Sequence, residues 1–191
     1  MAAVRVTMTG KTTSILACCF CMGMFMLAPA RARADEASPH PGVGGHIGIA
    51  ITLVTVGSDD TTSLSDQFTL AFPIGIGFKL SDKAALDFET VVGNPISPRG
   101  TTSLVVDPGI VYDMGSVVIG LRLAFKVPSD TNVGLIPLIH KGIANIGGGA
   151  NWFIEAAFPT FVSLTTDNTQ TPPADKTTFE LNVVVHTGIG F

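Results

Sequence analysis

Residues 67–80 alternate without a break between large apolar side chains and small or polar ones. One face of the segment would carry Phe68, Leu70, Phe72, Ile74, Ile76, Phe78 and Leu80. The other face would carry Gln67, Thr69, Ala71, Pro73, Gly75, Gly77 and Lys79. Because successive side chains of a strand point to opposite faces of a sheet, this pattern predicts a long β-strand with one wholly apolar face.

The same alternation recurs along the rest of the chain. It is clear in residues 46–53, 86–93, 104–113, 117–127 and 179–191, and fair in residues 151–162. In the first of these segments Leu53 falls on the same face as Ile47. In residues 134–142 either set of alternate positions could be the apolar face, so this segment is assigned to a strand by elimination. The glycines at 147–149 are assigned to a bend or bulge. We count eight strands, or ten if residues 134–162 contain an extra hairpin.

The connections between these segments alternate in length. Longer, polar connections fall at residues 58–66, 94–102, 128–132 and 165–177, and tight turns fall at residues 81–83 and 114–116. This spacing predicts an up-and-down antiparallel sheet with short turns at one end and longer loops at the other.

The two faces differ in charge as well as in size. In the six clearest strands every charge lies on the face that also holds most of the glycine and alanine. Only 14% of the chain is charged and 46% is hydrophobic, whereas a soluble domain carries about a quarter charged residues. A water-exposed outer face would need many Lys and Glu residues. The sequence therefore predicts that the apolar face meets lipid and that the small and polar face lines a lumen.

Backbone hydrogen bonding requires such a sheet to close. An open edge in hydrocarbon leaves unpaired N–H and C=O groups, each of which costs several kcal/mol. We therefore expect an all-β fold, a closed antiparallel up-and-down transmembrane β-barrel of about eight strands.

The N-terminus has the layout of a secretory signal. Arg5 and Lys11 precede an apolar run at residues 15–30, which ends in small residues at Ala30, Ala32 and Ala34. We predict a cleaved signal peptide over residues 1–34, a periplasmic extension over residues 35–44 and a barrel over residues 45–191. An uncleaved anchor is the alternative, but the run is shorter than the roughly 20 residues that span a bilayer.

Removal of this segment changes the chemistry of the chain. Cys18, Cys19 and Cys21 all lie within it, so the mature chain would hold no disulfide or cysteine metal site. A lipoprotein that uses Cys18 is disfavoured, because too little apolar sequence precedes it. The segment also holds four of the 11 Lys and Arg residues and none of the 15 acidic ones, so the remaining 157 residues carry a net charge of −8. This balance argues against nucleic acid or anionic lipid as an electrostatic partner.

The export signal, the alternating segments and the terminal Phe191 together resemble the OmpA/OmpX-type small outer-membrane barrels of bacteria. In that family a terminal aromatic residue is read by the barrel-insertion machinery, a role that the resemblance gives to Phe191 and Ile189, with Val185 and Val183 continuing the pattern. His186 departs from the family pattern. The resemblance implies an outer-membrane location, with membrane lipid and the barrel-assembly machinery as partners.

The candidate site is the set of charges that should point into the lumen. Its members are Asp87, Glu89, Asp107, Arg122, Lys126, Glu155 and Glu180. Strand direction places Arg122 near Glu89, and Lys126 higher, with Asp107 and Glu180. An eight-stranded lumen is just wide enough for side chains to fill it, and buried charges must pair. A salt-bridged plug is therefore the favoured interpretation, and a proton or ion path is the alternative.

No residue set in the sequence requires catalysis. Glu155 and His186 could form a general acid–base pair, as in lipid A deacylase barrels, but no serine lies near His186 in the sequence. We interpret His186 as a hydrogen-bonded lumen histidine, and we expect no catalytic residues.

Cofactor and metal sites are likewise not expected. Gly75 and Gly77 do not continue into a nucleotide-binding motif with a following helix. His40 and His46 lack further ligands for a metal. Solvated loops explain Asp59, Asp60 and residues 165–177 better than a Ca²⁺ site or a surface partner does.

These observations predict a non-enzymatic outer-membrane barrel with a structural or interaction role and an unidentified loop partner. The alternative is a narrow channel or transporter for a small solute. A lipid-modifying enzyme is a third, weaker hypothesis.

Overall fold

The computed structural model describes residues 42–58, 60–127, 132–167 and 174–191, with the backbone alone for residues 165–167 and 174. The predicted signal peptide, its three cysteines, most of the predicted extension with His40, and Asp59 lie outside the described residues. Among the residues that are described, no helix is long and apolar enough to cross a membrane.

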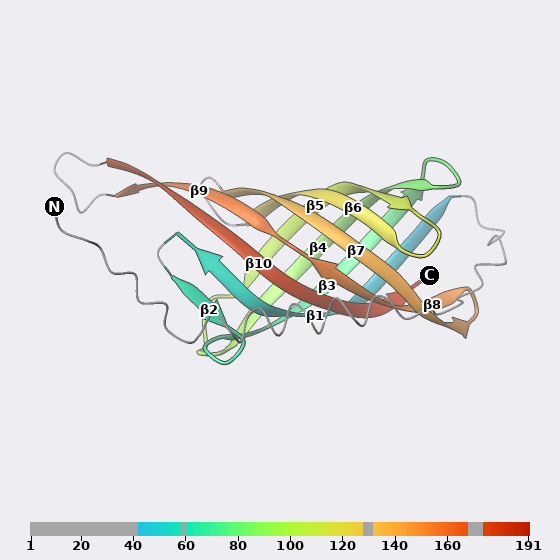
Figure 1. The fold of residues 1–191 in the computed structure, drawn as a ribbon, viewed down its shortest axis with the longest axis horizontal. Coiled ribbons are helices and arrows are strands. Elements are labelled where there is room, and N and C mark those ends of the chain that lie inside the picture. Colours follow the sequence, from blue (N-terminus) through green and yellow to red (C-terminus); the bar gives the residue numbers. More distant parts are fainter. Residues whose placement is uncertain (1–41, 59, 128–131, 168–173) are drawn as a thin grey trace, which may run out of the picture. The chain divides into compact units, whose positions relative to one another are not determined.

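The described chain is built of antiparallel strands that follow one another around a barrel (Figure 1). The strands are β1 (Val43–Gly57), β2 (Thr61–Ser63), β3 (Phe68–Lys79), β4 (Ala84–Ser97), β5 (Ser103–Asp113), β6 (Val118–Val127), β7 (Asn132–Gly147), β8 (Ala150–Ala157), β9 (Thr160–Asp167) and β10 (Ala174–Gly190). β8 and β9 are two parts of one barrel strand, because both pair with β7 on one side and with β10 on the other. β2 is a three-residue addition that pairs with the end of β1.

Pairing between the first and last strands closes the barrel. β1 and β10 pair from His46 opposite Gly190 to Gly57 opposite Glu180. Beyond this ladder the amide of Gly45 donates to the carbonyl of Phe191 at 2.7 Å, and the amide of Phe191 donates back at 2.9 Å. The predicted closed antiparallel barrel of eight strands is thus confirmed, and the described residues contain no extra hairpin that would make ten.

The two ends of the barrel differ as the sequence spacing predicted. Tight turns join β3 to β4, β5 to β6 and β7 to β8 at one end of the barrel, which we name the turn end. The start of β1 and the end of β10 lie at this end as well. The other end carries the longer β1–β3 and β4–β5 connections, and we name it the loop end. The predicted bend or bulge at residues 147–149 lies at the β7–β8 connection: the pairing shifts between Asn145 and Gly147, and Gly148 and Gly149 form the turn, with φ values of +90°, +64° and +85° along the three glycines. Glycine adopts this left-handed region without steric cost, which explains three in succession.

The apolar side chains face outward and the charged ones face inward. On β6 the outward Leu121 and Leu123 are each 52% exposed, whereas Arg122 between them is 2% exposed. The same holds on β3 and β4, where Ile74 and Ile76 are exposed while Asp87 and Glu89 are buried. This distribution is the reverse of that in a water-soluble domain, where charged residues are almost never buried unless they are paired.

A β-bulge in β1 overturns one predicted face. Thr52 pairs with Val184 and Val54 pairs with Val183, so Leu53 is the extra residue. The bulge shifts the alternation by one position, as β-bulges do. Val56 is therefore exposed outside, whereas the hydroxyl of Thr55 donates to Asn182 inside at 2.6 Å. The prediction that Leu53 continues the face of Ile47 was wrong for this reason.

The lumen is less uniformly polar than the sequence suggested. Phe153 and Phe161 are 2% and 3% exposed and point inward, although only small and polar side chains were expected to line the lumen. Phe161 packs with Ala124, Ile136, Leu138 and Ala157 in an apolar cluster on one side of the lumen. Residues 134–142 fit either phase because Leu135 and Ile139 are apolar outside while Ile136 and Leu138 are apolar inside.

Candidate functional site

Seven strands, β1, β4, β5, β6, β7, β8 and β10, bring ionisable side chains together near the middle of the lumen. We name this group the Arg122 cluster, and its members are His46, Asp87, Glu89, Asp107, Arg122, His140, Glu155 and His186. Register explains the convergence, because Glu89 lies opposite Asp107 on β5 and Glu155 lies between His140 on β7 and His186 on β10. Gly109 faces Arg122 across the β5–β6 ladder, where an added Cβ would lie 2.5 Å from Arg122 Cγ. Glycine therefore makes room for the guanidinium.

Arg122 is the centre of the cluster. Its Nε and Nη2 contact Asp87 Oδ2 at 2.7 Å and 2.6 Å, and its Nη1 contacts Glu89 Oε1 at 2.9 Å. A longer contact of 3.5 Å joins Nη1 to Glu155 Oε1. All four side chains are buried, so these are hydrogen-bonded ion pairs shielded from water. Charge-assisted pairs of this kind are the strong ones, and each partner is costly to remove.

Three histidines complete the contacts of the two glutamates. His46 Nε2 lies 2.5 Å from Glu89 Oε2, His140 Nδ1 lies 3.6 Å from Glu155 Oε2, and His186 Nδ1 lies 3.5 Å from Glu155 Oε1. The ring of Phe153 packs against all three imidazoles, at centroid distances of 5.9, 4.4 and 4.9 Å. The sequence interpretation left His46 and His140 out of the lumen set and did not consider Phe153. His46 lies on the same face of its strand as Ala50, His140 as Leu138, and Phe153 as Glu155. This alternation was the sequence signal that places the three side chains inside.

Asp107 differs from the other carboxylates. It is fully buried, and neither of its oxygens has a hydrogen-bond partner. It lies level with Glu89, so the expectation that it would sit higher, with Lys126, was wrong. Lys126 Nζ instead contacts Glu180 Oε1 at 2.9 Å and lies 4.2 Å from the centroid of the Phe161 ring. Glu180 also accepts from Asn182 Nδ2 at 2.7 Å. We name Lys126 and Glu180 the upper pair.

A cavity of about 290 Å³ occupies the lumen between the Arg122 cluster and the loop end. Its floor includes Glu89, Asp107, Arg122, Glu155 and His186, and the upper pair lies along its wall. The remainder of its lining combines small or weakly polar residues such as Ala50, Thr69 and Ser103 with larger apolar ones such as Ile136 and Phe161. None of the described residues between the cluster and the turn end lines it, so the cavity stops at the cluster.

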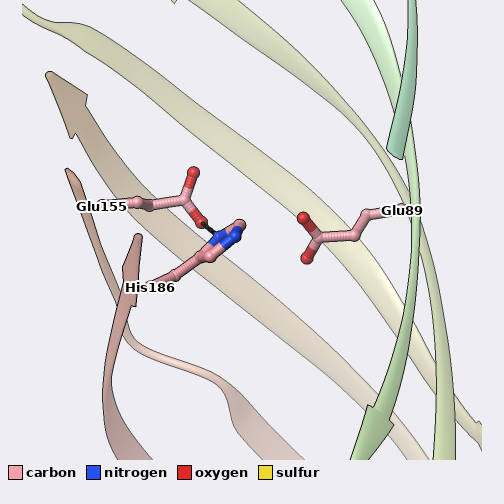
Figure 2. A group of neighbouring side chains, drawn as sticks. All are labelled: Glu89, Glu155 and His186. Carbon is pink, nitrogen blue, oxygen red and sulfur yellow. Dashed lines mark ion pairs between the residues drawn. The ribbon is translucent and has the colours of Figure 1, made fainter. Parts of the chain in front are cut away.

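Glu89, Glu155 and His186 all line the cavity floor, and their side chains point toward one another (Figure 2). One potential ligand atom from each lies within 4.8 Å of the others, and this is the group that the described residues offer for a metal ion. Glu155 and His186 do meet, as an acid–base pair would require. However, Glu155 also contacts Arg122 and His140, so its carboxylate is a charge partner for three groups rather than a free base.

The predicted insertion signal lies at the end of β10. Phe191 and Ile189 are both exposed, and Ile189 pairs with Ile47 beside the closure of the barrel.

Comparison with known proteins yields little beyond the fold. No protein-family model and no curated protein matches the chain. Among solved structures, the chain is similar to one described as "De novo design of transmembrane beta-barrels". The two are 12% identical, the match covers 80% of this chain and 99% of that chain, and the TM-score is 0.38.

Proposed function

We propose that the mature chain is an integral barrel of the bacterial outer membrane, with a structural or interaction role and no enzymatic activity. The observation that carries this proposal is the inversion of polarity, with apolar side chains exposed all around the barrel and ionisable side chains buried within it. In water, the exposed face would be an apolar surface far larger than the few hundred Å² that soluble monomers tolerate. In a bilayer, the same surface meets acyl chains.

Strand length supports a membrane-spanning barrel. A transmembrane strand needs about 9–11 residues at the usual tilt. β3, β5 and β6 contain 12, 11 and 10 residues, and their outward faces are apolar from end to end. Exposed aromatic side chains at Phe78, Tyr112 and Trp152 lie near the turn end, where an aromatic girdle is expected.

The contents of the lumen support a closed barrel rather than an open pore. The Arg122 cluster and Phe153 occupy the lumen at one level, and most of their side chains are buried. In addition, the cavity ends at the cluster. We therefore expect no continuous water path, and we infer that the loops and the lipid-facing surface are the parts that contact partners.

Single-channel recording tests this proposal. Purified barrel in a planar bilayer should give no discrete conductance steps, because the lumen is blocked. Reproducible steps that disappear on heat denaturation would instead establish the second candidate, a narrow channel. The specific observation in favour of that candidate is the cavity of about 290 Å³, which has the size of a small solute.

Membrane insertion itself is tested by one outward substitution and a matched loop control. Leu121→Arg should weaken stability in lipid vesicles by about 2–4 kcal/mol, because it places a charge on the lipid face near mid-height. Thr101→Arg in the β4–β5 connection should leave stability unchanged. Equal effects of the two substitutions, or a wild-type barrel that stays monomeric in water without detergent, would overturn the membrane assignment.

Export and assembly are further parts of the proposal. We expect secretion to remove residues 1–34, so that N-terminal sequencing of the mature protein begins at Asp35. We also expect Phe191 and Ile189 to act as the signal for the barrel-assembly machinery. Phe191→Ser should reduce the amount of inserted barrel in cells, while the purified variant still refolds in detergent.

A further inference from the structure

We propose that the Arg122 cluster contains a binding site for one divalent first-row transition-metal ion, with Glu89, Glu155 and His186 as its ligands. This inference goes beyond the proposed function and does not depend on it. It also departs from the sequence, in which no metal site was expected.

The first observation is the donor set. Two carboxylates and one imidazole present ligand atoms within 4.8 Å of one another, from strands on different sides of the lumen. Ligand atoms bound to Zn²⁺ at about 2.0–2.2 Å lie roughly 3.3–3.6 Å apart in a tetrahedral site. Small side-chain rotations would therefore complete the site without any movement of the barrel. Two oxygens and one nitrogen suit Zn²⁺ and its first-row neighbours better than Ca²⁺ or Mg²⁺, which prefer oxygen ligands alone.

The second observation is that the cluster contains polar atoms for which the protein supplies no partner. Both carboxylate oxygens of Asp107 are fully buried without a hydrogen bond, and so is Nε2 of His186. Buried polar atoms without partners are rare and costly. Asp107 lies level with Glu89 on the neighbouring strand and lines the same cavity floor. A cation bound by Glu89 would place positive charge beside Asp107 and give His186 Nε2 a ligand bond.

The charge of the cluster is the third observation. Four carboxylates, at Asp87, Glu89, Asp107 and Glu155, share one guanidinium at Arg122, so with all four ionised and the histidines neutral the cluster would carry three excess negative charges. Such an excess is unfavourable in a buried site. One divalent ion would reduce it to a single negative charge.

Neighbouring side chains already hold the proposed ligands in place. Glu89 is fixed by His46 and Arg122, and Glu155 by His140 and Arg122. A carboxylate has about four lone-pair positions, so it can accept these contacts and still bind a metal ion. Outer partners of this kind orient the ligands of natural metal sites. The cavity that opens toward the loop end supplies the route of entry.

The proposal is tested by titration of metal-stripped, refolded full-length mature barrel with Zn²⁺ in detergent, followed by calorimetry. We expect one saturable site that Mg²⁺ at the same concentration does not fill. His186→Gln and Glu89→Gln should each weaken Zn²⁺ binding by at least about tenfold, the loss that even outer partners of a metal site produce. Two matched controls should bind Zn²⁺ like the wild type: His40→Ala, in the predicted extension, and Glu180→Gln, in the upper pair.

A further variant keeps the test valid if the ligand substitutions impair folding. Asp107 makes no hydrogen bond, so Asp107→Asn should fold at least as well as the parent, as judged by heat-modifiable gel mobility. It should nevertheless bind Zn²⁺ more weakly, because the cluster loses a carboxyl group that can carry negative charge beside the bound ion.

Co²⁺ supplies an independent measurement on the wild type, because its visible absorption reports coordination by nitrogen and oxygen. Loss of the absorption in His186→Gln supports the site. Absence of saturable Zn²⁺ binding to the folded wild type would overturn the proposal and indicate that protons alone neutralise the cluster. The proposal would also be overturned if folded His186→Gln and Asp107→Asn kept full affinity for Zn²⁺ while His40→Ala lost it. That result would indicate an adventitious site.

Discussion

The Arg122 cluster and the upper pair solve the same electrostatic problem in two different environments. Each joins a basic side chain of β6 to carboxylates on other strands, and the two bases are only four residues apart. The side chains of Arg122 and Glu89 are 3% and 4% exposed, whereas those of Lys126 and Glu180 are 25% and 38% exposed. The two groups therefore differ in burial: the Arg122 cluster is an ion-pair network on which the barrel depends, whereas the upper pair lies beside a water-accessible cavity.

This difference shows that the number of ion pairs in a lumen says little about how much each contributes to the free energy of unfolding. A partly exposed pair gains little, because water screens it and both side chains lose conformational freedom. Within the buried cluster, by contrast, removal of one partner leaves the others charged and without compensation. Substitutions at corresponding positions in the two regions should accordingly differ by several kcal/mol.

The largest effect is expected at the centre of the cluster. Arg122→Leu should destabilise the barrel by about 3–5 kcal/mol, because it leaves the carboxylates of Asp87 and Glu89 buried without their cation. The urea midpoint of unfolding in lipid vesicles, or the temperature of the heat-modifiable gel shift, measures the loss. Addition of Asp87→Asn should restore part of the stability. An unchanged midpoint for the single variant would contradict the assigned pairing.

A smaller loss is expected where the backbone makes room for Arg122. In Gly109→Ala the new methyl group would lie 2.5 Å from both Arg122 Cγ and the carbonyl oxygen of Leu121, so strand or side chain must shift. Overpacking of this kind costs about 1–3 kcal/mol. Gly142→Ala is the matched control, since nothing lies within 4 Å of its added Cβ. Equal urea midpoints for the two alanine variants would show that the cluster is not tightly packed against β5.

The upper pair should respond weakly to the loss of its cation. Lys126→Met should reduce stability by no more than about 1 kcal/mol, because water reaches both partners and Asn182 continues to donate to Glu180. Unfolding measured beside Arg122→Leu, in the same lipid, gives the comparison directly. A loss as large as that of Arg122→Leu would mean that burial does not decide the weight of these pairs.

Ionic strength should produce the smallest effect, and only in one of the two regions. Between about 0.1 M and 1 M salt the Debye length falls from about 10 Å to about 3 Å, which screens exposed pairs and leaves buried ones nearly unaffected. The stability difference between wild type and Lys126→Met should shrink by a few tenths of a kcal/mol. The difference between wild type and Arg122→Leu should stay constant across the same titration.

Alternation in the sequence was sufficient to predict the fold and the direction of most side chains. Ile74 and Glu89 could be placed outside and inside because a strand has a period of two, and closure followed from the hydrogen bonds of the backbone. Alternation was insufficient at Leu53, since a bulge adds a residue without any change in composition. It also failed for residues 134–142, because Ile136 and Leu138 pack inside against Phe161, so both faces of that strand are apolar.

The contents of the site were predictable only in part. The charges at Asp87, Glu89 and Arg122 were placed in the lumen because charge on a lipid-facing strand is costly. The partners of each charge depend on the stagger between strands that are distant in sequence, and this is why Asp107 was placed beside Lys126. His46 and His140 were left out because the lumen set was chosen by formal charge, and a neutral histidine does not show from its charge which face of the strand it occupies.

The reciprocal hydrogen bonds between Gly45 and Phe191 have a consequence for how the protein is made. Gly45 belongs to the first strand and Phe191 follows the last one, so this seam joins the two ends of the barrel sequence. A nascent or partly exported chain therefore always presents an unsatisfied strand edge, and contacts between the extremes of the sequence form slowly because loop closure must precede them. Biogenesis of this barrel must consequently keep the strands unfolded and protected until β10 is available to pair with β1.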